Sequence, residues 1–137
     1  MKLSTPERVL ALTLVAYIVF DILLTPVARL ETRSAANITG LGLVTLGLIF
    51  VGLALAIVSL VLLFRRSRRT AVVAIVAAVL CFPAALADLT GNFSSVRQPV
   101  AIEVIELVQI VVALFLIGAG IWIMRGARAA ETTNRQP

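Results

Sequence analysis

The chain has 137 residues, of which 61% are hydrophobic and 14% charged, and its formal net charge is +5. This length gives room for one domain, and a mean hydropathy of +1.08 lies far outside the range of soluble globular proteins. With no histidine and one cysteine, Cys81, the sequence excludes histidine-ligated haem, imidazole-based zinc or copper sites, Ser-His-Asp catalysis and an intramolecular disulfide. We therefore predict an integral membrane protein that is not an enzyme and needs no cofactor.

Four apolar segments predict four transmembrane helices, because about 20 apolar residues cross the hydrocarbon core as a helix. In chain order, the predicted spans cover residues 6–27, 38–64, 70–90 and 99–124. We expect an all-α, antiparallel up-down bundle over residues 1–125, followed by a disordered basic tail over 126–137. The first segment lacks a small-residue cleavage site, so we expect a retained span and not a signal peptide.

Local signals mark the ends of the first two helices. Thr5 is expected to cap the first helix, and Pro26 is expected to end or kink it. Asn37 or Thr39 suits the cap position of the second helix. Asn37 and Asn92 also begin Asn-x-Ser/Thr sequences, which are potential glycosylation sites.

The third and fourth spans carry signals of their own. Pro83 is expected to interrupt the third helix, because it has no amide proton for the carbonyl of Val79. Gly91 suits the left-handed position that ends a helix. Near the end of the fourth span, Trp122 is typical of an interfacial anchor on the inner side.

The segment RRSRR is the strongest signal for orientation, because lysine and arginine near span ends are retained on the cytoplasmic side. Placing it inside puts both termini inside, with nine cationic and two acidic residues there against three cationic and five acidic residues outside. We expect anionic lipid headgroups and not nucleic acid as its partners, in the cytoplasmic membrane. The predicted topology and headgroup residues are Arg65, Arg66, Arg68 and Arg69.

Small residues recur at heptad spacing within three spans, which predicts close packing between helices. Membrane helices associate through such packing, since lipid is as apolar as leucine. The predicted packing residues are Gly42, Thr45, Gly52, Ala56 and Ser59 in the second span, Ala74, Ala78 and Ala85 in the third, and Ala113 and Gly120 in the fourth.

Four carboxylates are expected near the outer boundary, and two interpretations stay open. Acids near helix ends can complement helix dipoles and pair with arginines of the loops. Alternatively, they are weak candidates for a cation or proton site, since carboxylates suit hard cations and can relay protons. The four residues are Asp21, Asp88, Glu103 and Glu106.

Asp21 is the acid that most needs explanation, because it is expected below the outer headgroups. A buried carboxyl requires a partner or a proton. We expect that partner to be Tyr17, Arg29 or Glu106.

The leading functional hypothesis is a structural or accessory subunit that packs against other membrane proteins in a larger assembly. The alternative is a small homo-oligomeric cation or proton channel, transporter or pore-forming protein that uses the outer carboxylates. Both hypotheses imply the lipid bilayer as surroundings and either other membrane subunits or further copies of the chain as partners.

Overall fold

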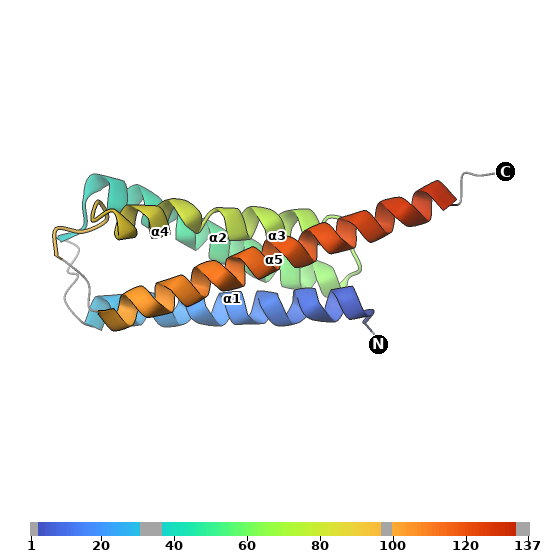
Figure 1. The fold of residues 1–137 in the computed structure, drawn as a ribbon, viewed down its shortest axis with the longest axis horizontal. Helices are drawn as coiled ribbons and strands as arrows, with labels where there is room; N and C mark the ends of the chain where they lie inside the picture. Colours follow the sequence, from blue (N-terminus) through green and yellow to red (C-terminus); the bar gives the residue numbers. More distant parts are fainter. Residues whose placement is uncertain (1–2, 31–36, 97–99, 134–137) are drawn as a thin grey trace.

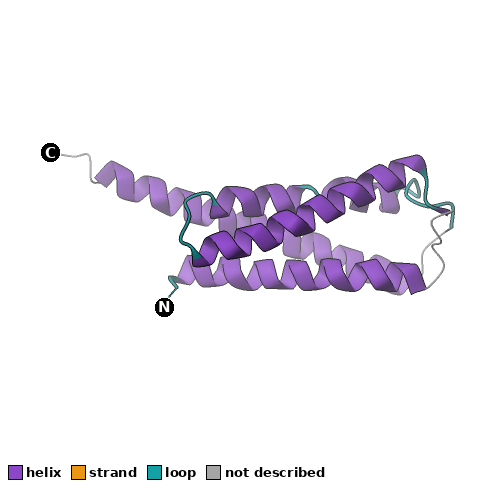
Figure 2. Cartoon of the chain, turned by 180° about the vertical axis from the view of Figure 1, so that it is seen from behind, coloured by secondary structure: helices purple, strands orange, loops and turns teal. Residues whose placement is uncertain are grey.

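The computed structural model describes residues 3–30, 37–96 and 100–133, and these parts consist of helices and loops (Figures 1 and 2). The helices, in chain order, are α1 (Thr5–Leu30), α2 (Gly40–Phe64), α3 (Thr70–Val79), α4 (Phe82–Leu89) and α5 (Val100–Thr133). The prediction of an all-helical chain is confirmed for the part that the structure describes.

Three helical segments are long and apolar enough to cross a membrane. They are Gly40–Phe64, the combined α3 and α4 over Thr70–Leu89, and Val100–Ala127. The chain is therefore an integral membrane protein. These three segments are those found among the described residues; α1 has a similar length and carries Glu7 and Arg8 in its first turns and Asp21 further along.

The helices lie side by side as an elongated bundle. α1 packs mainly against α5, while α2 packs against α3, and α3 also contacts α5. The N-terminus, the turn between α2 and α3, and the C-terminal part of α5 share one end of the bundle (Figure 1). The loops that precede α2 and follow α4 lie at the opposite end.

The first helix differs from its prediction at both ends. Ser4 and not Thr5 precedes the helix: its backbone N–H and its hydroxyl donate to the carboxylate of Glu7 at 2.7 and 2.8 Å. The prediction was that Pro26 ends or kinks the first helix; α1 continues past Pro26 to Leu30, so Pro26 does not end it. A proline removes only one backbone donor, and long apolar helices tolerate it because neighbouring groups satisfy the freed carbonyl.

The second helix begins at a junction between two loops, residues 37–39 and 92–95, which we call the loop junction. Thr39 caps α2, as predicted, by accepting the Gly42 N–H at 2.9 Å. Its hydroxyl also donates to the Asn92 carbonyl, and its own N–H donates to the Phe93 carbonyl at 3.0 Å. The two potential glycosylation sequences therefore fasten one loop to the other.

The third predicted span is interrupted where Pro83 predicted it. α3 ends at Val79 and α4 begins at Phe82, with the proline in the first turn of α4. At the other end of α4, Gly91 adopts the left-handed conformation, with φ of 70°. The Asn92 N–H donates to the Ala87 carbonyl there at 2.8 Å, which completes the helix end.

The fourth predicted span is longer than expected. α5 extends to Thr133, so residues 126–133 of the predicted disordered tail continue the helix. This stretch contains three alanines and Arg128, residue types that favour helix, and the first proline after it is Pro137. Residues 134–137 of that predicted tail lie outside the described residues.

The interior of the bundle is lined by small residues, and large apolar side chains point outward. Leu10, Leu14 and Leu116 fill the remaining central volume. Outward-facing residues such as Leu12, Val44 and Phe115 are 65–71% exposed, which suits contact with lipid tails. Ala85 is half-buried, and the other predicted packing residues are buried: Gly42, Thr45, Gly52, Ala56, Ser59, Ala74, Ala78, Ala113 and Gly120.

Candidate functional site

A cluster of buried polar groups lies where α1, α5 and the break between α3 and α4 meet. Tyr17 and Asp21 are four residues apart on α1, so they share one face of that helix, and they are 0% and 1% exposed. Gln109 of α5 is 7% exposed, and its Nε2 donates a hydrogen bond to Oδ1 of Asp21. The side chain of Tyr17 lies one helical turn from that of Asp21 on the same face of α1. We call Tyr17, Asp21 and Gln109, with the Ala77 carbonyl, the polar cluster.

The break between α3 and α4 supplies the fourth member of the polar cluster. In a continuous helix the Ala77 carbonyl would accept the N–H of Cys81, but that N–H donates to Ala78 at 3.4 Å. The Ala77 carbonyl accepts the Tyr17 hydroxyl instead, at 3.1 Å. A side chain of α1 thus satisfies a backbone group that the helix break releases.

Two small residues allow the helices to approach at this point. A Cβ added at Gly52 of α2 would lie 3.1 Å from the Ala77 carbonyl oxygen and 3.4 Å from the Tyr17 hydroxyl. Cys81 is buried against Tyr17. A Cβ at Gly52 would be tight against the Ala77 carbonyl oxygen, so the glycine lets α2 lie close to the polar cluster.

A model of a protein family, described as "Domain of unknown function (DUF8051)", matches residues 6–136. The chain belongs to the DUF8051 family. No curated protein and no solved structure matches the chain. The match covers every residue of the polar cluster. The description of the DUF8051 family names no activity, so the chemistry of the polar cluster is inferred from its geometry.

The structure separates Asp21 from the other three candidate acids of the DUF8051 chain. Asp88, Glu103 and Glu106 are half-buried, whereas Asp21 lies in the interior. The donor that the structure gives Asp21 is Gln109, about one helical turn deeper along α5 than Glu106. In the part of the chain that is described, no three His, Cys, Asp or Glu side chains are arranged to hold a metal ion.

One signal in the sequence pointed toward this pairing. Gln109 follows Glu106 by three residues and so lies on the same face of the fourth predicted span. Tyr17 was among the expected partners of Asp21; its hydroxyl donates to the Ala77 carbonyl. The side chain of Arg29, another expected partner, lies outside the described residues. The Ala77 carbonyl was not foreseen, since the accepting group belongs to the backbone.

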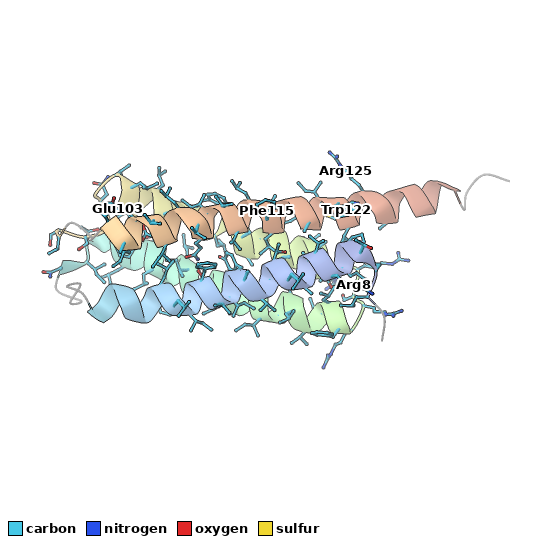
Figure 3. All side chains as sticks on the ribbon, turned by 60° about the horizontal axis from the view of Figure 1, so that its bottom comes forward. Arg8, Glu103, Phe115, Trp122 and Arg125 are labelled. Carbon is cyan, nitrogen blue, oxygen red and sulfur yellow. The ribbon has the colours of Figure 1, made fainter. Side chains whose placement is uncertain are left out.

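Charged residues of the DUF8051 chain gather at opposite ends of the bundle. Figure 3 shows Arg8, Trp122 and Arg125 toward one end and Glu103 at the other. The turn between α2 and α3, at the arginine end, exposes Arg65, Arg66, Arg68 and Arg69. Arg66 adopts a left-handed conformation there, with φ of 52°, which helps the chain reverse within a short turn. Trp122 is 50% exposed.

Proposed function

We propose that α1 is a fourth membrane span and that both termini lie on the cytoplasmic side. The separation of charge supports this topology: the exposed arginines lie at the end that carries the N-terminus, while Glu103 lies at the opposite end (Figure 3). The packing of α1 supports it as well, because α1 packs against α5 and α2 and contributes Leu10, Leu14 and Tyr17 to the core.

This topology predicts that Ser67 and Ser95 lie on opposite sides of the membrane. In a Cys81→Ala background, Ser67→Cys is expected to react with a membrane-impermeant maleimide only when the cytoplasmic face is exposed. Ser95→Cys is expected to react only from the other face. Labelling sealed membranes of each orientation measures both. Reaction of both cysteines from one side would contradict the four-span topology.

We propose further that the protein is a structural or accessory subunit that packs against other membrane proteins. The observation that supports this proposal is the contrast between the polar groups inside the bundle and the apolar side chains on its outer surface. The polar groups of the interior bond to one another, as in the polar cluster, while the helices present large apolar side chains outward along their lengths. What the chain offers a partner is therefore mainly helix surface within the bilayer.

Purification in mild detergent tests this role. The tagged protein is expected to elute as a particle heavier than its own micelle, with other membrane proteins in fixed ratio. A matched sample solubilised in a harsh detergent that separates membrane complexes serves as the control. A single small homo-oligomer without other proteins would contradict the subunit role.

A second candidate function is a small oligomeric proton or cation conductor. The buried position of Asp21 favours it, since ionisable residues inside membrane bundles often mark such pathways. Flux of protons or cations into liposomes that contain the purified protein, and its loss in Asp21→Asn, would favour this candidate. Equal flux with and without the protein would contradict it.

A further inference from the structure

The turn between α2 and α3 carries its arginines on a backbone that is fixed by hydrogen bonds. The Arg65 N–H donates to the Val61 carbonyl at 3.1 Å, which closes the end of α2. On the other side of the turn, the Thr70 hydroxyl donates to the Ser67 carbonyl at 2.7 Å, and the Thr70 carbonyl accepts the Ser59 hydroxyl at 3.0 Å. These bonds use backbone groups and short hydroxyls. The turn is therefore ordered before its arginine side chains bind anything.

The contact between α5 and α3 fixes the level of this turn along the bundle. A Cβ added at Gly120 of α5 would lie 3.2 Å from the carbonyl oxygen of Ala71, in the first turn of α3. Toward the end of the bundle, Trp122 lies two residues beyond Gly120, and Arg69 lies two residues from Ala71, a helix rise of about 3 Å in each case. Tryptophan favours the level of the lipid headgroups. Trp122, 50% exposed, therefore places the turn at that level.

Exposed arginines gather around this turn. Arg125 of α5 follows Gly120 by five residues and lies toward the same end of the bundle (Figure 3). Among the acids whose side chains the structure describes, Glu7 is the one at this end, and its carboxylate accepts the N–H and the hydroxyl of Ser4. Positive charge therefore predominates here. We call the following exposed residues the arginine patch: Arg65, Arg66, Arg68, Arg69 and Arg125.

The arrangement of the arginine patch matches an anion with two phosphate groups. A guanidinium binds phosphate oxygens through two parallel N–H donors. Arg65 follows the end of α2 and Arg69 precedes α3, and packed helices lie about 8–10 Å apart, so the patch offers guanidinium groups on two sides of the turn. A single phosphodiester carries one negative charge and pairs with one side. Two linked phosphates pair with both sides at once, and the ordered turn lowers the entropic cost of binding them.

We propose that the arginine patch is a binding site for a phospholipid whose headgroup carries two phosphate groups. The phosphates bind the guanidinium groups on the two sides of the turn, and the acyl chains lie along the apolar outer surface of the bundle. That surface reaches the patch at Phe64, which ends α2 directly before Arg65 and is 57% exposed, and it favours a lipid over a free polyphosphate. The proposal rests on the patch lying at a membrane surface, and not on the subunit role or on which side is cytoplasmic.

Native mass spectrometry of the full chain in a non-ionic detergent tests the proposal, because added lipid then reaches both ends of the bundle. The probes are cardiolipin, with two phosphates, and phosphatidylglycerol, with one, compared at equal phosphate concentration. A basic residue at an anionic membrane surface contributes about fivefold in affinity. Cardiolipin is therefore expected to bind at least about tenfold more tightly than phosphatidylglycerol, and Arg65→Gln/Arg69→Gln is expected to weaken its binding about 25-fold.

Lys2→Gln/Arg135→Gln is the matched control, since it removes the same charge from residues outside the arginine patch, and it is expected to bind cardiolipin as the parent does. Equal affinity of the parent for the two lipids would overturn the proposal. An equal loss in both double variants would overturn it as well, because net charge alone would then attract the lipid. Displacement of cardiolipin by an equal concentration of inorganic pyrophosphate would assign the patch to a free polyphosphate and not to a lipid.

Discussion

Replacing Gly42 by alanine is expected to destabilise the bundle by about 2–4 kcal/mol, more than is usual for so small a change. A Cβ at this position would lie 2.2 Å from the Phe93 carbonyl oxygen and 2.7 Å from Cγ2 of Ile38. The first of these atoms belongs to the backbone, so the loop has to move. That movement breaks the bond from the Thr39 N–H to the Phe93 carbonyl and opens the loop junction.

Gly47→Ala is the matched control, because both glycines lie in α2 and nothing lies within 4 Å of a Cβ added at Gly47. Alanine favours helix over glycine by about 0.8–1 kcal/mol, so this variant is expected to be as stable as the parent or more so. Thermal unfolding in one detergent, followed by circular dichroism, measures both variants. Equal melting temperatures for the two would show that the loop junction does not restrain α2.

In α2, the sequence predicts the buried face of small residues but not the contact between Gly42 and Phe93. Heptad spacing of small residues arises from a single helical face, so it can be read without knowing the neighbouring helix. The buried polar and small residues of α2 lie on that face. The close approach of Gly42 to Phe93 is different, since it depends on how two loops about fifty residues apart meet. No local pattern contains that information.

The polar cluster shows the same limit. The sequence indicates that Asp21 needs a partner, because its position within an apolar helix is a local property. Which residue of α5 it meets depends on the axial register of two helices far apart in the chain. A shift of one turn along α5 exchanges Glu106 for Gln109, and so replaces an acid by an amide. The structure places Gln109 there.

At the break between α3 and α4, the sequence does not predict every backbone carbonyl that loses its helical donor. Pro83 predicts an interruption, and the expected carbonyl without a donor was that of Val79. The structure shows a further change two residues earlier, where the Cys81 N–H donates to the Ala78 carbonyl and the Ala77 carbonyl accepts the Tyr17 hydroxyl. Two effects thus coincide at one place: the break releases an acceptor, and α1 provides the hydroxyl that satisfies it.

Removing the amide of Gln109 while keeping its shape is the second variant with a large expected effect. Gln109→Met leaves Oδ1 of Asp21 buried without the donor that the structure provides, and the loss is expected to be about 1–3 kcal/mol. Asp21→Leu, which keeps a similar branched shape, should cost a similar amount because it leaves the Gln109 amide buried. Unfolding of each variant by sodium dodecyl sulfate in mixed micelles measures these losses.

The double variant decides whether the pair acts as a unit. If Asp21 and Gln109 satisfy each other, replacing both by apolar residues of similar shape removes the need for either bond, so the double variant should be more stable than the sum of the single losses predicts. Hydrogen bonds between membrane helices contribute about 0.6 kcal/mol on average and about 1.7 at most, so a coupling energy within that range is expected. Additive losses would mean that the two side chains are stabilised by other groups, and that the register of α1 against α5 does not depend on their bond.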